Sequence, residues 1–176
     1  MDAGDAKSGA ERPGIGSRLG VLVATVLGIG YAPLAPGTWG TAAAIPLVLV
    51  SGGLTQWAYL VLCVAVTAVA IAASGAADRA FGDHDSGRIV VDEVAGYFWT
   101  MAAAADRTDP LLLAAGFILF RVADIVKPPP ARAIDRRMAG GTGVVLDDVV
   151  AGWWAAAALF LLERSGLLAH VPWPWR

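Results

Sequence analysis

Long apolar runs alternate along the chain with short polar connectors that are rich in Gly or Pro. The run at residues 54–77 is uncharged throughout and exceeds the roughly 20 residues that a helix needs to cross a bilayer. No segment alternates apolar and polar positions as a strand would, so the pattern predicts an all-α protein, a compact multi-helix bundle embedded in a membrane. Further helices are expected at residues 39–50, with an interruption at Pro46, and at residues 94–105, 111–126, 131–138 and 149–162.

The N-terminal segment differs from the rest of the chain. Residues 1–18 are polar, small and mixed in charge, which is typical of a disordered tail and unlike the basic start of a secretion signal. The apolar run that follows, residues 19–32, is too short to span a bilayer, so it is predicted to form a re-entrant or interfacial helix. The length of 176 residues fits one domain, and we expect a single helical domain over residues 19–170.

Composition supports a membrane location and narrows the chemistry. Hydrophobic residues make up 57% of the chain and charged residues 16%, and the mean hydropathy is +0.62, well on the apolar side of soluble averages. A net charge of −2 argues against a nucleic-acid partner, because such proteins usually carry a basic excess. The single cysteine, Cys63, lies in an apolar run without a neighbouring His or acid, which excludes an intrachain disulfide and a cysteine nucleophile.

Two acidic pairs, Asp92-Glu93 and Asp147-Asp148, each stand at the start of an apolar run. Carboxylates there are costly to desolvate, so they need a metal ion, a cationic partner or a water-filled site. In both places a glycine, Gly96 or Gly152, follows an Asp four positions later. On a helix such residues share a face, so a second helix can pack closely beside the acid. The pattern predicts a carboxylate site shared by two helices of a bundle.

A count of membrane crossings places the polar segments together. If the apolar runs cross in turn from Thr38, every unusual polar segment falls at one end of the bundle, opposite the turns at residues 52–53 and 106–109. The same end carries most of the basic residues, so the positive-inside tendency predicts that it faces the cytoplasm. These basic residues are Arg79, Arg88, Arg121, Lys127, Arg132, Arg136 and Arg137.

The polar end contains the groups that phosphoryl chemistry requires. Its carboxylates can hold Mg²⁺, a hard cation that prefers oxygen ligands. Arg121, Asp124 and Lys127 are spaced by three, so they follow one side of a helix, and the two cations can bind phosphate oxygens. Gly-rich segments at residues 37–41 and 140–143 precede predicted helices and offer backbone N–H groups to an anion. Each feature also has a structural interpretation as a helix cap, an ion-paired helix end or a turn, but their convergence favours a site for transfer or hydrolysis at a phosphate.

Four motifs, in order along residues 20–160, resemble those of the bacterial phosphatidylglycerophosphatase A family. The resemblance implies a Mg²⁺-dependent lipid phosphatase at the bacterial inner membrane, and the excess of basic residues at the polar end predicts that its active site lies on the cytoplasmic face. Its substrate would be phosphatidylglycerol phosphate, hydrolysed to phosphatidylglycerol and phosphate in phospholipid biosynthesis. The four motifs are residues 35–41, 89–96, 120–128 and 135–152.

The resemblance also implies roles for individual residues. The expected reaction is attack on the phosphate monoester by a metal-activated water, with an aspartyl-phosphate intermediate as the rival route. Adjacent residues on a helix point about 100° apart, and both routes leave open which acid of each pair binds metal and which acts as base. The expected catalytic residues are Asp92, Glu93, Asp124 and Asp148, the phosphate-binding residues are Thr38, Arg121, Lys127 and Arg136, and the Mg²⁺ ligands are Asp92, Glu93, Asp147 and Asp148, with Asp135 as a further matching position.

Two other classes stay open as alternatives. One is another phospholipid phosphotransfer enzyme, although the Asp-Gly-x-x-Ala-Arg opening of the CDP-alcohol phosphatidyltransferases is absent. The other is a non-enzymatic transporter or scaffold whose intramembrane charges line an ion path, which release of inorganic phosphate would separate from a phosphatase. The expected partners are the lipid bilayer and the lipid substrate, without nucleic acid, and a homo-oligomer is left open.

Overall fold

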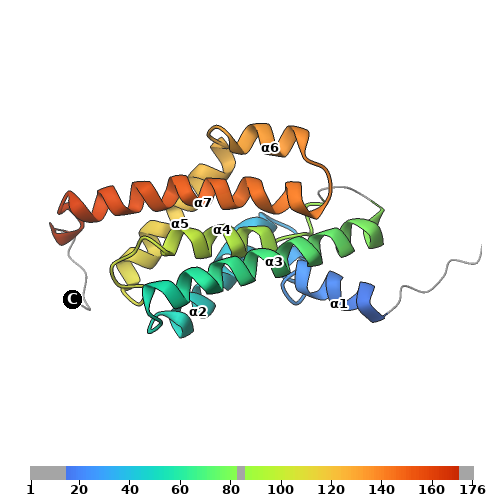
Figure 1. Cartoon of the computed structure of the whole chain (residues 1–176), viewed down its shortest axis with the longest axis horizontal. Helices are drawn as coiled ribbons and strands as arrows, with labels where there is room; N and C mark the ends of the chain where they lie inside the picture. The colour runs from blue at the N-terminus through green and yellow to red at the C-terminus, as the bar shows by residue number, and fades with distance from the viewer. Residues whose placement is uncertain (1–14, 83–85, 171–176) are drawn as a thin grey trace, which may run out of the picture.

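The computed structural model describes residues 15–82 and 86–170, and over these residues the chain is all-α (Figure 1). Seven α-helices and two short 3-10 helices form one bundle, with no strand in the described part. The predicted fold class is therefore confirmed. The helices are α1 (Ile15–Ala24), η1 (Ile29–Tyr31), α2 (Pro36–Ser51), α3 (Gln56–Phe81), α4 (Val91–Met101), α5 (Pro110–Val126), α6 (Ala131–Arg137), α7 (Gly141–Arg164) and η2 (Leu167–His170).

The N-terminal apolar run folds into two elements and not into one helix. α1 begins at Ile15, inside the segment predicted to be a tail, while residues 1–14 lie outside the described residues. The helix ends because the backbone turns through left-handed conformations at Val26, Leu27 and Gly28, with φ of 47°, 57° and 93°. The prediction of a single short helix across this run is wrong in its extent.

The two Gly-rich segments predicted as loops form the first turns of helices instead. α2 begins at Pro36, whose fixed φ suits the first helical position, and α7 begins at Gly141. Close packing explains the glycine, because a Cβ on Gly141 would lie 2.4 Å from the backbone of Gly75 in α3. α2 also continues through Pro46, which was predicted to interrupt it, with the loss of one backbone hydrogen bond.

α4 lies inside the bundle and packs most extensively against α7. The two helices touch between Gly96 and Gly152, where a Cβ on Gly152 would lie 2.3 Å from the Gly96 carbonyl oxygen. The Thr100 hydroxyl donates to the Gly96 carbonyl at 3.0 Å and lies 3.4 Å from the carbonyl of Gly152. The prediction that these glycines allow two acid-bearing helices to pack closely is confirmed.

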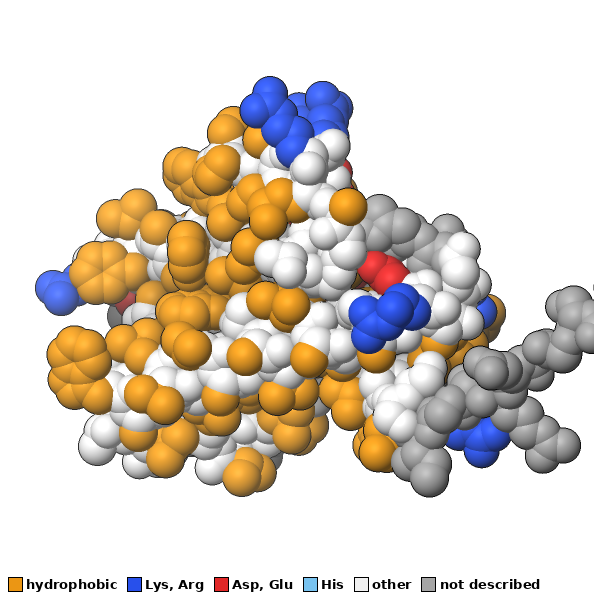
Figure 2. All heavy atoms as spheres, turned by 45° about the vertical axis from the view of Figure 1, so that its right-hand side comes forward, with side chains coloured by type: hydrophobic (Ala, Val, Ile, Leu, Met, Phe, Trp, Pro, Cys, Tyr) orange, Lys and Arg blue, Asp and Glu red, His pale blue; other side chains and the backbone are white. Residues whose placement is uncertain are grey.

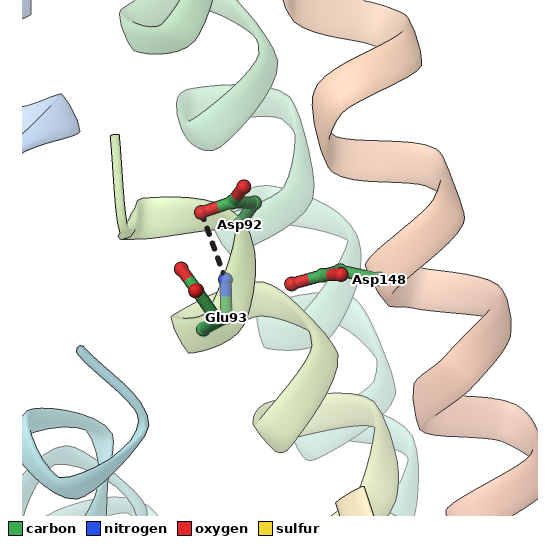
Figure 3. A group of neighbouring side chains, drawn as sticks. All are labelled: Asp92, Glu93 and Asp148. Atoms are coloured by element: carbon green, nitrogen blue, oxygen red, sulfur yellow. Dashed lines mark hydrogen bonds between the residues drawn. The ribbon is translucent and has the colours of Figure 1, made fainter. Parts of the chain in front are cut away.

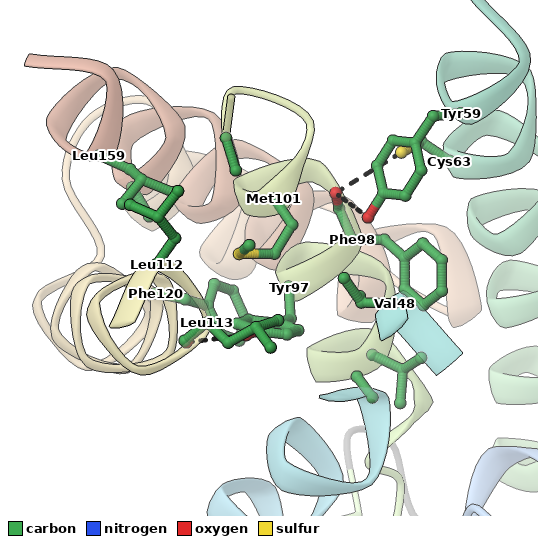
Figure 4. Packing of buried hydrophobic residues seen from close by; sticks show 14 of the residues in the cluster. Val48, Tyr59, Cys63, Tyr97, Phe98, Met101, Leu112, Leu113, Phe120 and Leu159 are labelled. Carbon is green, nitrogen blue, oxygen red and sulfur yellow. Dashed lines mark hydrogen bonds between the residues drawn. The ribbon is translucent and has the colours of Figure 1, made fainter. Parts of the chain in front are cut away.

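Aromatic side chains of α4 fill the hydrophobic core (Figure 4). Tyr97 lies against Phe120 of α5, with ring centroids 6.5 Å apart, and donates its hydroxyl to the Leu113 carbonyl at 2.9 Å. Phe98 stacks on Tyr59 of α3 at 5.8 Å. Because large aromatic side chains dominate core packing, these contacts hold α4 between α3 and α5. They therefore set the position of the acids at the start of α4.

Among the described helices, α3 and α7 are long and apolar enough to cross a bilayer. Figure 2 shows basic side chains gathered over α6, acidic atoms in a recess below them, and hydrophobic side chains across much of the remaining face. The last turn of α6 carries Arg136 and Arg137. This distribution agrees with a membrane-embedded bundle that carries its polar groups at one end.

Candidate active site

Three carboxylates converge where α4 and α7 meet (Figure 3). Asp92 and Glu93 lie in the first turn of α4, and Asp148 faces them from a position two turns into α7. One carboxylate oxygen of each residue lies within 4.8 Å of the others. Asp92 and Asp148 are buried, with 9% and 4% of their surface exposed. The structure thus brings together three of the four acids predicted as metal ligands.

Burial and mutual repulsion disfavour the charged forms of these acids. Burial is the largest cause that raises the pKa of Asp92, and the charges of Glu93 and Asp148 add to it. Burial is also the largest cause that raises the pKa of Glu93, and the nearby charge of Asp124 adds to it. A bound cation would oppose both effects, because its charge favours the carboxylate form.

Glu93 presents a buried oxygen to this group. Its backbone amide donates to Asp92 Oδ1 at 3.1 Å, and its Oε1 lies 3.6 Å from Arg121 Nη1. The second oxygen, Oε2, is buried and has no hydrogen-bond partner within the described residues. A buried polar atom in this state is costly unless a further ligand reaches it. The set of carboxylate oxygens and this atom fit a hard divalent cation such as Mg²⁺.

Arg121 of α5 lies at the edge of the carboxylate group. Its Nη1 is 2.9 Å from Asp124 Oδ2 and 3.5 Å from Thr41 Oγ1 of α2. Its Nε is buried and has no hydrogen-bond partner in the part of the chain that the structure describes. A guanidinium carries five donors in a planar fork, so Arg121 has donors left for a further acceptor while Asp124 holds its orientation.

The first turn of α2 closes one side of the site. A Cβ on Gly37 would lie 1.9 Å from Glu93 Oε1 and 3.1 Å from Arg121 Nη1, so the helix backbone touches both side chains. The Thr41 hydroxyl donates to the Gly37 carbonyl at 2.9 Å. Because residues 37–41 were interpreted as a loop, the contact of Gly37 with Glu93 and Arg121 was not predicted. The signal for it in the sequence is the glycine itself, which allows other groups to come close to the backbone.

Lys127 and Asp147 form a second polar group on another side of α7. Lys127 follows the last residue of α5, and its Nζ lies 2.5 Å from Asp135 Oδ1 of α6 and 2.6 Å from Asp147 Oδ2. Burial by itself lowers the pKa of Lys127, but the two carboxylates outweigh burial and the net shift is upward. The structure therefore groups Asp147 with Lys127 and not with the acids predicted to share a metal with it.

Thr38 and Arg136, also predicted to bind phosphate, are not part of the carboxylate group. Thr38 is partly buried in the first turn of α2, and Arg136 is exposed on α6. No hydrogen bond or ion pair joins either of them to the three carboxylates over residues 15–82 and 86–170. Their roles toward phosphate stay predictions.

Fold and site together define an all-α protein with a buried acidic centre suited to a cation and an arginine suited to an anion, a combination that serves phosphate chemistry.

Residues 22–163 match the family model described as Phosphatidylglycerophosphatase A. Phosphatidylglycerophosphatase A of Escherichia coli (strain K12) is 36% identical over 124 residues, 70% of this chain and 72% of the relative. The Haemophilus influenzae protein of the same name is 34% identical over 125 residues, 70% and 76% of the two chains. A Bacteroides thetaiotaomicron protein, provisionally named phosphatidylinositol-3-phosphatase, is 36% identical over 135 residues, 73% and 84% of the two chains.

The chain belongs to the phosphatidylglycerophosphatase A family and is a phosphatase. The resemblance carried by the four motifs is thereby confirmed. The matched segment runs from α1 to the last turn of α7, so it includes every acid of the site. No solved structure matches the chain.

Proposed function

We propose that this protein is a Mg²⁺-dependent phosphatidylglycerophosphatase, which hydrolyses phosphatidylglycerol phosphate to phosphatidylglycerol and inorganic phosphate in phospholipid biosynthesis. The observation that carries the proposal is the group of Asp92, Glu93 and Asp148, in a chain whose family is named for this activity. The apolar helices and the basic residues at the polar end support a location in the bacterial inner membrane, with the site on the cytoplasmic face.

The metal would be held by the three convergent carboxylates. Asp92, Glu93 and Asp148 supply only oxygen ligands, which suits Mg²⁺ better than a softer metal. When bound, the ion would supply positive charge that polarises the phosphate ester and lowers the pKa of a water molecule. We do not assign Asp147 to this ion, because the Lys127 ammonium lies 2.6 Å from its Oδ2.

The side chains around the metal site would bind phosphate and accept a proton. Arg121 Nη1 lies 3.6 Å from Glu93 Oε1, so a phosphate oxygen entering there could take a donor from the guanidinium. Asp124 orients that guanidinium at 2.9 Å and is our candidate for the base that accepts the proton of the attacking water. Direct attack by an Asp oxygen is the rival route, and trapping of a labelled phosphoenzyme would reveal it.

Phosphate release by the purified protein in detergent tests the proposal. We expect hydrolysis of phosphatidylglycerol phosphate with Mg²⁺, loss of activity in excess EDTA and recovery when Mg²⁺ is added back. The control variant Asp106→Asn removes an exposed carboxylate in the connection between α4 and α5, and it should keep wild-type activity. Absence of phosphate release with Mg²⁺ would contradict the substrate, and undiminished activity after chelation would contradict the metal.

The headgroup specificity needs its own comparison. The provisional name of the Bacteroides thetaiotaomicron relative makes phosphatidylinositol 3-phosphate the appropriate second substrate, because both lipids are phosphate monoesters on a polyol headgroup. We expect a higher kcat/KM for phosphatidylglycerol phosphate. A preference for the inositol lipid would keep the reaction type and change the substrate.

A further inference from the structure

An apolar hollow lies on the flank of α2 that faces away from the carboxylates. It has a volume of about 550 Å³ and is lined by the turn at residues 28–32, by Trp39 and by two alanines of α2. Leu27 and Leu34, on either side of this turn, are each 78% exposed. Apolar surface gathered in this way is costly in water and well accommodated against hydrocarbon. The hollow therefore suits an apolar ligand or the interior of a bilayer.

The turn that forms the hollow is fixed to the segment leading into the site. The Val90 amide donates to the Ala24 carbonyl at 2.9 Å, and Val90 is the residue that precedes α4, two positions before Asp92. A Cβ on Gly30 would lie 1.9 Å from the Arg88 carbonyl oxygen, so the two backbones are in contact. These contacts hold the hollow at a constant position relative to the carboxylates.

α2 presents different faces to the hollow and to the site. Gly37 and Thr41 face the carboxylate site, whereas Trp39 and Ala42 face the hollow. Successive helical residues are rotated by about 100°, which places Thr38 between these two faces at the N-terminal end of the helix. The separation is about one helix diameter, on the order of 10 Å. A lipid headgroup of two phosphates joined by a glycerol can extend over a comparable distance.

We propose that this hollow holds an acyl chain of the lipid whose terminal phosphate lies at the carboxylate site. The inference rests on the proposed function and adds the place where the apolar part of the substrate binds. The headgroup would pass over the N-terminal end of α2, where Thr38 offers a hydroxyl, and the chain would enter between Tyr31 and Trp39. The exposed leucines beside the turn would lie in the bilayer that supplies the lipid.

A second apolar hollow, of about 590 Å³, lies between α3, α6 and α7, but it suits this chain less well. The residues of α7 that line it, such as Val150 and Trp153, lie mainly on the side of the helix away from Asp148. The N-terminal end of α7 is also covered, because a Cβ on Gly143 would lie 2.1 Å from the Met138 carbonyl oxygen. At α2, by contrast, Leu34 and Ala35, the residues that lead into the helix, are exposed.

Filling each hollow separately tests the assignment. Ala43→Phe fills the hollow beside α2, and the matched control Ala68→Phe fills the hollow beside α3. With long-chain phosphatidylglycerol phosphate we expect KM to rise ~10-fold for Ala43→Phe and to stay unchanged for Ala68→Phe. With a short-chain analogue both variants should behave as the wild type. Equal effects of Ala43→Phe on both substrates, or a larger effect of Ala68→Phe, would overturn the inference.

A measurement on the unaltered protein makes the result independent of how a variant folds. A phosphonate analogue of the substrate, with a photoreactive group on one acyl chain, is cross-linked in detergent micelles and its adducts are mapped. We expect adducts within residues 28–43, and weaker labelling there by a photoreactive phosphatidylcholine. Adducts on α3 and α7, or equal labelling by phosphatidylcholine, would refute the assignment. Turnover of the wild type is measured in the same preparation, so failure of the proposed function is seen separately as absence of phosphate release at any chain length.

Discussion

Replacement of Gly37 by Ala should displace one carboxylate of the site and leave the bundle folded. The new Cβ would lie 1.9 Å from Glu93 Oε1, whereas real Cβ contacts are not shorter than 3.0 Å, so the oxygen must retreat by at least 3.0 − 1.9 = 1.1 Å. The displaced atom is the far end of a flexible side chain, which can move at small cost. The substitution therefore acts on the position of Glu93 more than on the packing of α2.

The expected loss of catalysis is much larger than the change in stability. A misplacement of about 1 Å can lower a rate by about 100-fold, and we expect kcat to fall by that amount. Ala favours a helix over Gly by at most about 1 kcal/mol in the first turn, which partly offsets the weakened contact of Glu93 with Arg121, a partly exposed pair worth at most about 1 kcal/mol. The free energy of unfolding should therefore change by less than about 1 kcal/mol.

Phosphate release and thermal unfolding followed by circular dichroism measure the two quantities. Gly53→Ala is the matched control, because a Cβ there meets no atom within 4 Å. Gly152→Ala is the opposite case, since its Cβ would lie 2.3 Å from the backbone oxygen of Gly96, and we expect it to lower the free energy of unfolding by about 2 kcal/mol. Normal turnover by a folded Gly37→Ala variant would refute the requirement for Glu93 at its observed position. Unfolding of the Gly37→Ala variant would show that the α2 backbone, and not the Glu93 side chain, moves to relieve the contact.

Three further predictions test the other groups. Asp148→Asn removes a charge and keeps the shape, so kcat should fall at least about 100-fold with unchanged helicity; normal turnover would exclude Asp148 from the site. Lys127→Met should lower the free energy of unfolding by about 1–3 kcal/mol, because its two carboxylate partners lose their cation; unchanged stability with a raised KM would instead make Lys127 a substrate-binding residue. The orientation is tested with single cysteines, Thr108→Cys and Gly87→Cys, placed at exposed positions in a Cys63→Ser background. A membrane-impermeant thiol reagent, applied to intact cells with a permeabilised outer membrane, should label Thr108→Cys and not Gly87→Cys. The reverse pattern would invert the proposed orientation.

The apolar runs predict most of the helices that form. α3 and α5 correspond closely to the predicted runs, because an uninterrupted apolar segment of that length favours a helix. The starts of α2 and α7 differ from the prediction. Glycine disfavours a helix by about 1 kcal/mol, so sequence reasoning assigns Gly-rich segments to loops. In the folded protein Gly141 lies against the backbone of Gly75, which leaves no room for a Cβ, and Gly37 lies against the Glu93 side chain, so glycine at that helix start lets Glu93 keep its position.

The sequence by itself determined where two acid-bearing helices meet, because an Asp followed by a glycine four positions later marks a face that another helix can approach. The same spacing places Asp148 on the face of Gly152, but it did not show which group Asp147 joins, since adjacent helical residues point about 100° apart and Asp147 was also predicted to bind the metal. In the folded bundle the contact of Gly152 with Gly96 fixes the rotation of α7, which turns Asp148 toward α4 and places Asp147 beside Lys127. The sequence specifies spacing along each helix, whereas the rotation of one helix against another depends on packing between segments far apart in the chain.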